Sequence, residues 1–439
     1  MAQQTITRES SSPVWEAVSR WLPLANPDLE YWWKLTGPHV AHMMETAGHS
    51  VEAQYNALLF HYSYVIPYLG HAPKSDGRLQ WNSLLGNKGS PIEYSWKWNT
   101  TKARPDVRYC IEAIGPYAGR ALDPLNQDAS IEMLHQLAET VPTVDLTWTN
   151  HFVDILFDHN RGKHAADGAT STILIAPEWL EKGFNIKSYF LPRRLGKNAS
   201  TKGLLTLAEW EKHMAHLDPD NKARKAMFDF LSNDPEGQYL TPYMVAVDNV
   251  KPSKSRLKLY FLGSRTSFAS VRSIMTMSGY KQVPEEYLQK LRSLICAVAG
   301  VGPDFPEDQE LPSISDDYTT WTKDNSGEVP EVLRHNVYYF DIAPGKSVPD
   351  IKFYIPVRDH SPKDYEVAGN LIDWMKNRGR GAYAGAYLDM LRYLNQYRKL
   401  EDSKCAHSYI SCLIKGDGEL DITSYLGAEA VAIDDNARQ

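Results

Sequence analysis

The sequence lacks the features that mark several common classes of protein. Its four cysteines (Cys110, Cys296, Cys405 and Cys412) are scattered without a CxxC pair, which argues against a disulfide framework or a zinc site. No apolar run reaches about 18 residues, so no transmembrane helix is expected. Segment 1–12 is polar and lacks the apolar core of a secretory signal. We therefore expect a cytoplasmic protein.

The usual anion-binding motifs are also missing. The formal net charge of -7 argues against a nucleic-acid or anionic-membrane surface. The sequence contains no GxxxxGK[ST] loop and no GxGxxG after a strand. It has no DDxxD cluster either, because Asp316-Asp317 is followed by Tyr-Thr-Thr and Asp434-Asp435 lies in a polar tail. Any anion that the protein binds is thus expected to meet a local cluster of basic side chains, without a metal or cofactor.

What the sequence does contain is a regular alternation of helices with pairs of strands. Tails at 1–12 and 429–439 flank one predicted domain, 13–428, and nothing indicates an oligomeric state. Asn26 and Pro27 predict a helix start, Thr206 and Glu209 a capping box, and Ser361 and Asp364 another cap. Helices are predicted at 26–45, 50–64, 128–140, 206–217, from 284, after 361 and at 383–400. Strands are predicted at 91–98, 107–112, 151–157, 171–176, 184–191, 241–248, 255–262, 336–342, 350–357, 407–414 and 419–425.

Directly joined strand pairs favour antiparallel pairing over a doubly wound parallel sheet. About ten antiparallel strands with helices between the pairs predict an α+β fold, either a barrel with a helical outer layer or two stacked sheets.

A repeated strand pattern favours the barrel. Residues two apart in a strand share a face, and three strands place a cation beside a tyrosine in this way. The pattern comprises Lys187 and Tyr189; Arg256, Lys258 and Tyr260; and Lys352 and Tyr354, while Tyr409 with Lys415, Tyr425 and Arg108 offer related parts. These faces either are solvated or converge inside a barrel. Converging cations would bind diphosphate oxygens and tyrosine rings would stabilise an allylic carbocation.

Glu93 is a lone carboxylate in an aromatic-rich strand. If it points inward, it needs a donor such as an indole N–H, which it would also activate for attack. Alternatively it pairs with Lys97 or Lys102 at the surface.

From about residue 28 to residue 425 the chain resembles the fungal aromatic prenyltransferases of the dimethylallyltryptophan synthase type. The resemblance is carried in order by Asp28-Leu-Glu-Tyr-Trp-Trp, Gln54-Tyr55, Pro67-Tyr-Leu-Gly70, Pro91-Ile-Glu93, Asp123-Pro124-Leu-Asn126, Lys187-Ser-Tyr-Phe, Ser253-Lys-Ser-Arg-Leu-Lys-Leu-Tyr260 and Ser408-Tyr-Ile-Ser411. It implies the ten-stranded αββα (ABBA) barrel. It also implies metal-independent transfer of a dimethylallyl group from dimethylallyl diphosphate to an indole-containing small molecule.

The resemblance implies roles for individual residues. Glu93 matches the glutamate that binds the indole nitrogen and can take its proton. The diphosphate-binding cations would be Arg108, Lys187, Arg256, Lys258, Lys352 and Lys415. The cation-shielding tyrosines would be Tyr189, Tyr260, Tyr354, Tyr409 and, if one residue is inserted before it, Tyr425.

Leu174 stands where members that prenylate free tryptophan at the indole 4-position have a lysine. The substitution favours a bulkier acceptor, such as an indole alkaloid or a tryptophan-containing cyclic dipeptide, with Leu84 and Leu85 also lining its pocket. Two alternatives remain: the same reaction on a phenol or quinone, and an inactive barrel that binds an aromatic ligand. A metal-dependent terpene cyclase is a further alternative, and loss of activity in the presence of a chelator would favour it.

Overall fold

A computed structural model describes residues 12–23, 26–75, 77–83, 85–86, 89–99, 103–162, 171–180, 183–193, 205–313, 335–396, 399–404 and 406–428. The strands are β1 (Ile92–Trp98), β2 (Asp106–Ile111), β3 (Ile173–Leu180), β4 (Gly183–Phe190), β5 (Leu240–Asp248), β6 (Leu257–Gly263), β7 (Asn336–Ile342), β8 (Asp350–Pro356), β9 (His407–Ile414) and β10 (Leu420–Gly427). The helices are α1 (Pro13–Trp21), α2 (Pro27–Thr46), α3 (Val51–Phe60), α4 (Asp128–Thr140), α5 (Thr147–Leu156), α6 (Leu207–Leu217), α7 (Lys222–Asn233), α8 (Pro235–Gln238), α9 (Phe268–Thr276), α10 (Glu285–Ala299), α12 (Val357–His360), α13 (Asp364–Lys376) and α14 (Ala384–Leu394).

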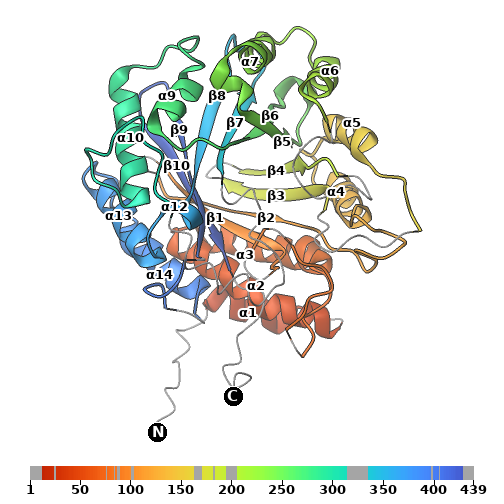
Figure 1. Cartoon of the computed structure of the whole chain (residues 1–439). Coiled ribbons are helices and arrows are strands. Elements are labelled where there is room, and N and C mark those ends of the chain that lie inside the picture. Colours follow the sequence, from red (N-terminus) through yellow and green to blue (C-terminus); the bar gives the residue numbers. More distant parts are fainter. Residues whose placement is uncertain are drawn as a thin grey trace.

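In the described part of the chain, ten antiparallel strands close into a barrel in the order β1-β10-β9-β8-β7-β6-β5-β4-β3-β2. Closure comes from β1, which pairs with β2 on one side and with β10 on the other. The helices lie around the outside of the barrel (Figure 1). This confirms the predicted αββα barrel and eliminates two stacked sheets, because closure leaves no strand edge unpaired.

The barrel wall is packed on its outer face by aromatic side chains. In β1, Tyr94 and Trp96 are fully buried, and they alternate with Glu93, Ser95 and Lys97 on the inner face. Because side chains alternate along a strand, each strand sends one set to the helices and the other into the barrel. The main apolar core of the protein thus lies between the wall and the helices, and the other set of side chains lines the barrel interior.

A buried hydrogen-bond network joins α13 and α14 to the outer face of β9. His407 Nδ1 lies 2.8 Å from Asp364 Oδ1, and the Tyr387 hydroxyl lies 2.8 Å from His407 Nε2. The Asp364 carboxylate also accepts the backbone N–H groups of Ala406 and His407. Hydrogen bonds to buried charged groups are stronger than neutral ones, so this network fixes the two helices on the barrel.

Several predicted elements differ in the structure. The strand predicted at 151–157 is wrong: α5 occupies this region, and Trp148, Phe152 and Leu156 are buried at a spacing of four. Ser361 and Asp364 do not form the predicted cap, because α13 begins after Lys363 and Asp364 binds His407 instead. The helix predicted at 383–400 ends at Leu394.

The other helix starts follow their capping residues. Asn26 accepts from the N–H of Leu29 at 3.0 Å, and Thr206 and Glu209 form a complete capping box. Helix α3 ends at Phe60 and continues as a π-helical turn over His61–Val65. Helix α1, at the start of the predicted domain, carries no prediction from the sequence.

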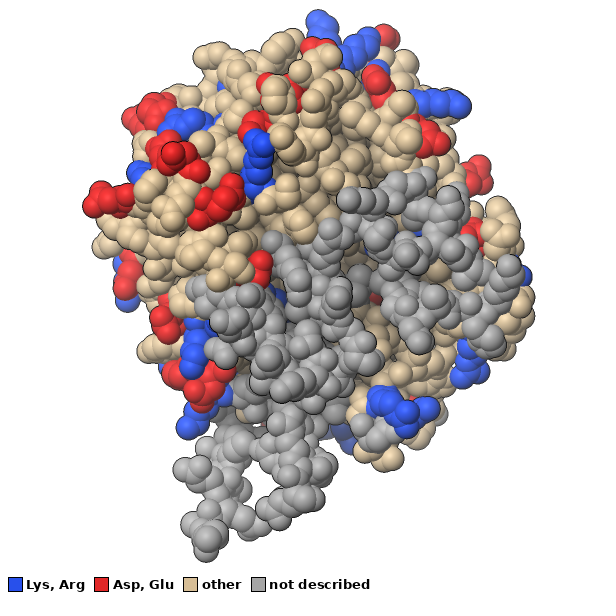
Figure 2. Space-filling model, in the orientation of Figure 1, with Lys and Arg blue, Asp and Glu red and all other residues tan. Residues whose placement is uncertain are grey.

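Charge is distributed differently outside and inside the barrel. On the face drawn in Figure 2, acidic and basic side chains are interspersed over the described residues. None of the helices in the described ranges is both long and apolar enough to span a bilayer. In contrast to this mixed surface, a cluster of Lys and Arg side chains lies in the barrel interior.

Candidate active site

The strand directions arrange the inward side chains in layers. Strands β4, β6 and β8 run in the same direction, so the order lysine then tyrosine puts Lys187, Lys258 and Lys352 at one level of the barrel and their tyrosines at the next. The intervening strands run the opposite way and contribute to these levels from the other end, with the register staggered around the barrel. Tyr339 of β7 pairs with Tyr260 of β6, for example, and Asp341 pairs with Lys258, whereas on its other side Tyr339 pairs with Lys352 of β8.

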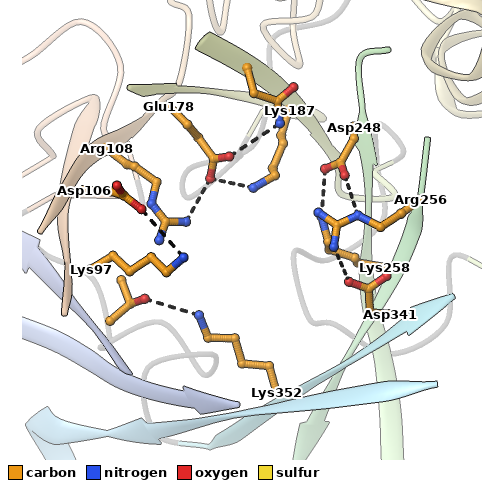
Figure 3. Close-up of polar contacts among 12 residues, drawn as sticks. Lys97, Asp106, Arg108, Glu178, Lys187, Asp248, Arg256, Lys258, Asp341 and Lys352 are labelled. Carbon is orange, nitrogen blue, oxygen red and sulfur yellow. Dashed lines mark hydrogen bonds and ion pairs between the residues drawn. The ribbon is translucent and has the colours of Figure 1, made fainter. Parts of the chain in front are cut away.

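The first level is a charged layer of cations held by carboxylates (Figure 3). It consists of Lys97, Asp106, Arg108, Glu178, Lys187, Asp248, Arg256, Lys258, Asp341, Lys352 and Asp421. Glu178 Oε1 accepts from Lys187 Nζ at 2.5 Å and from Arg108 Nη1 at 2.9 Å. Asp248 is held in the same way, at 2.8 Å from Lys258 Nζ and 2.7 Å from Arg256 Nε.

These contacts change the ionisation of the carboxylates. Burial opposes the charge on Glu178, but Lys187 and Arg108 outweigh it and lower the pKa of Glu178. Asp248 is likewise buried, and Lys258 and Lys187 bring its pKa to about 2. The cations are thus held in fixed positions by ionised carboxylates.

Lys352 differs from the other cations of this layer. Its Nζ contacts the Thr423 hydroxyl at 3.3 Å and lies 5.7 Å from the Tyr354 ring centroid. Among the described residues, no carboxylate lies within ion-pair distance of it. Burial therefore dominates and lowers the pKa of Lys352 to about 7, whereas that of Lys187 falls to about 8.

Lys415 is the one predicted cation that stands apart from the charged layer. It is exposed in the turn between β9 and β10, one residue beyond the end of β9. The five other predicted cations converge, as the alternation of the strands requires.

The second level is a tyrosine layer, which consists of Tyr189, Tyr260, Tyr339, Tyr354, Tyr409 and Tyr425. Tyr354 is at its centre, with ring centroids 6.2 Å from Tyr260, 6.0 Å from Tyr409 and 5.4 Å from Tyr425. Tyr189 lies 6.0 Å from Tyr260, so all five predicted tyrosines come together. This layer forms an apolar cluster inside the barrel, separate from the main core.

The third level contains Glu93, at the opposite side of the tyrosine layer from the cations. Glu93 pairs in register with Cys110 of β2, and its Oε1 accepts a 2.5 Å hydrogen bond from the Ser408 hydroxyl. Burial raises the pKa of Glu93 to about 7, partly offset by Ser408 and Arg358. Lys97 is paired elsewhere, 3.4 Å from Asp421 and 3.6 Å from Asp106, and Lys102 lies outside the described residues.

Of the three residues predicted to line the acceptor pocket, Leu174 and Leu85 lie in the described part of the chain. Leu174 lies in β3 beside Tyr189 and packs on the tyrosine layer. Leu85 is half-buried, with its N–H donating to the Ser83 hydroxyl at 3.1 Å. Leu84 lies outside the described residues.

Several interior residues carry no prediction from the sequence. Tyr339 was missed because the residue two positions away is Asp341, not a cation. The predicted pattern is a cation two residues from a tyrosine, so it does not include the carboxylates Glu178, Asp248 and Asp341. Parity on a predicted strand would have placed Asp248 and Asp341 inside the barrel. Within the described ranges, no group of three or more His, Cys, Asp or Glu side chains is arranged to hold a metal ion.

Comparison with known proteins gives consistent matches. Prenyltransferase anuH of Penicillium roqueforti is 56% identical over 421 residues, covering 95% of this chain and 92% of that protein. Xanthone prenyltransferase B of Emericella nidulans is 40% identical over 431 residues, covering 96% and 92%. The crystal structure of AnaPT from Neosartorya fischeri matches with a TM-score of 0.77 at 21% identity, covering 95% of this chain and 98% of that one.

The barrel, its layered interior and these matches define an aromatic prenyltransferase. More particularly, residues 28–390 match the tryptophan dimethylallyltransferase family, and the chain belongs to that family.

Proposed function

We propose that this enzyme transfers the dimethylallyl group of dimethylallyl diphosphate to an electron-rich aromatic ring by electrophilic substitution. The observation that carries the proposal is the order of the three levels: cations, then tyrosines, then Glu93. In this order, the diphosphate of an allylic diphosphate would face the cations and its apolar prenyl group would face the tyrosine rings.

Arg108, Lys187, Arg256, Lys258 and Lys352 would bind the diphosphate, with Lys415 at the rim. The bond between the allylic carbon and the bridging oxygen breaks, and its electron pair leaves with the diphosphate. Fixed cations favour this step because they stabilise the developing negative charge without reorganising. The tyrosine rings face the allyl cation with their negative quadrupoles and exclude water, which would otherwise quench it.

Glu93 would orient and deprotonate the acceptor. A ring carbon supplies a π electron pair to the allyl cation, and loss of the proton on that carbon restores aromaticity. A base works best when its pKa is near the working pH, and burial gives Glu93 a pKa of about 7. The carboxylate would accept a hydrogen bond from an O–H or N–H of the acceptor and so enrich the ring in electrons.

The acceptor class supported best is a hydroxylated aromatic. Two relatives that are 40% identical to this chain, each across 96% of it, are named xanthone prenyltransferases A and B. Leu174 adds an apolar wall where a charged group of an amino acid would be unsatisfied. An indole-containing acceptor is the second candidate, because Glu93 suits an indole N–H as well as a phenol O–H.

The test is incubation of the purified protein with dimethylallyl diphosphate, a chelator and an acceptor panel, with detection by mass spectrometry. The panel contains hydroxyxanthones, simple phenols, tryptophan and a tryptophan-containing cyclic dipeptide. We expect prenylated phenols and matched diphosphate release with chelator present. Acceptor binding without product or diphosphate release would support an inactive barrel that binds an aromatic ligand. Loss of activity in the presence of the chelator would instead favour a metal-dependent mechanism.

A further inference from the structure

A second polar group faces the Glu93 end of the barrel interior. Strand β5 has a register shift between Pro242 and Met244, so Tyr243 is an extra residue without a partner on β6. Such a bulge redirects a side chain relative to the regular alternation. Tyr243 is buried and belongs to the interior cluster with Tyr260 and Tyr354. The bulge therefore turns its side chain into the barrel interior.

Arg193 supports Tyr243 from the neighbouring strand. It lies three residues beyond β4 on the same parity as Tyr189 and Leu191, and only 7% of it is exposed. The Arg193 guanidinium acts on the Tyr243 hydroxyl, and one of its N–H groups donates to the Pro192 carbonyl at 3.1 Å. A guanidinium has donors only, so a hydrogen bond between the two side chains has the tyrosine oxygen as acceptor and leaves the phenolic proton for another partner.

The two carboxylates nearest in charge to Tyr243, Glu112 and Glu93, already accept hydrogen bonds from other groups. Glu112 accepts from the Trp81 indole, from the Ser83 hydroxyl and from the N–H of Ser171. Glu93 accepts from Ser408. Asp248 at the end of β5 belongs to the charged layer, and Tyr243 lies earlier on the same strand, toward the end of the barrel that contains Glu93. Glu112 and Glu93 also act electrostatically on Tyr243.

We propose that Tyr243, positioned and polarised by Arg193, donates a hydrogen bond to a carbonyl or carboxylate oxygen of the acceptor. The inference rests on the proposed function and narrows its substrate class. The ring would carry an O–H that meets Glu93 and, elsewhere on the same molecule, an oxygen acceptor that meets Tyr243. Arg193 is a positioning residue in this scheme, because it acts through the tyrosine.

The test uses two pairs of acceptors of different size, each differing only in the carbonyl. They are 2-hydroxyxanthone with 2-hydroxyxanthene, and 3-hydroxyacetophenone with 3-ethylphenol. A buried donor left unpaired strongly disfavours the analogue that lacks its partner, so we expect kcat/KM to favour the ketone by about tenfold or more. Tyr243→Phe should abolish this preference by raising the KM of the ketone, while the KM of dimethylallyl diphosphate stays unchanged.

Arg193 provides an independent arm. Arg193→Met should reduce the preference and Arg193→Lys should restore part of it, which a purely structural role would not do. Should Tyr243→Phe not fold, the two Arg193 variants carry the test with the same pairs.

The outcomes separate this inference from the proposed function. Equal turnover of ketone and carbonyl-free phenol by the native enzyme overturns the inference alone. A preference that survives in both Tyr243→Phe and Arg193→Met, or donor and acceptor KM values that rise together, also overturns it. If neither pair is prenylated while the tryptophan-containing dipeptide is, the hydroxylated-acceptor proposal falls and the inference falls with it.

Discussion

The Ser408 hydroxyl donates a 2.5 Å hydrogen bond to Oε1 of Glu93, although Ser408 lies on β9 and Glu93 on β1, with β10 between them. This contact partly offsets the burial that raises the pKa of the Glu93 carboxyl.

If Glu93 is the base, kcat/KM should rise with pH through about 7, because the raised pKa leaves the carboxyl protonated below that value. Ser408→Ala removes a contact that favours the ionised form, so the acidic limb should move to higher pH. Glu93→Gln should reduce turnover about a hundredfold or more without unfolding the protein. The pH profile of prenyl transfer checks this, with Ser232→Ala on the exposed face of α7 as control. An acidic limb that does not move in Ser408→Ala would contradict the assignment.

Binding of the diphosphate should be accompanied by proton uptake at Lys352. Burial lowers the pKa of this lysine to about 7, so at pH 8 its amine is mostly neutral in the free enzyme. A bound anion favours the charged form and draws in a proton, whereas at pH 6 the lysine is already charged. Calorimetry in buffers of different ionisation enthalpy should show the uptake at pH 8 only.

Two variants separate charge from titration at this position. Lys352→Arg stays charged and should lose its share of the uptake while retaining affinity. Lys352→Met should raise the KM of dimethylallyl diphosphate about tenfold, and Lys222→Met on the surface of α7 should not. Uptake that is unchanged in Lys352→Arg would assign it to another group, with Lys187 next because burial lowers its pKa to about 8.

Prenyl transfer should depend on the ring faces of the tyrosine layer more than on the tyrosine hydroxyls. Tyr354→Phe keeps the ring at the centre of the layer, whereas Tyr354→Leu removes it. The loss of about 2 kcal/mol of cation stabilisation corresponds to roughly 30-fold in kcat. The ratio of dimethylallyl alcohol to prenylated product should rise in Tyr354→Leu, because water gains access to the cation. Tyr280→Leu, at a position that is 64% exposed, is the control. Equal effects of Phe and Leu would point to the hydroxyl instead.

The Asp364–His407 contact should be important for stability. Asp364→Asn leaves a buried network incompletely paired and should cost roughly 3 kcal/mol, seen as a fall of several degrees in the melting temperature. Burial opposes ionisation of Asp364, but its bonds to His407 and to the backbone lower the net pKa. The native contribution is therefore present above the unfolded pKa of about 4 and is lost as the pH falls through the folded value. Asp373→Asn, exposed on the same helix, should have little effect, and an equal fall in both variants would contradict the expectation.

Strand alternation made much of the interior predictable from the sequence. Lys187 shares a face with Tyr189, and Lys352 with Tyr354, because residues two apart in a strand point the same way. The closed barrel decides that this shared face is the interior. The same logic failed for 151–157, where Phe152 and Leu156 fit either period and the packing of α5 on the barrel decided for a helix.

Other features depend on three-dimensional context that alternation does not contain. Tyr243 is directed by a bulge, which changes parity without a sequence signal. Lys415 has the right parity relative to Tyr409, but β9 ends before it and leaves it in a turn. The Glu93–Ser408 hydrogen bond joins residues 315 positions apart and exists only because the barrel closes.

The layered interior also bears on how such enzymes diversify. Residues assigned to the diphosphate occupy one end of the barrel strands, whereas Leu174, Tyr243 and Glu93 occupy the other. Under the proposed roles, mutations that reshape the acceptor end would leave ionisation of the prenyl donor undisturbed. A lineage could then change its aromatic substrate stepwise and keep a working electrophile at every intermediate, with the changes confined to one end of the barrel.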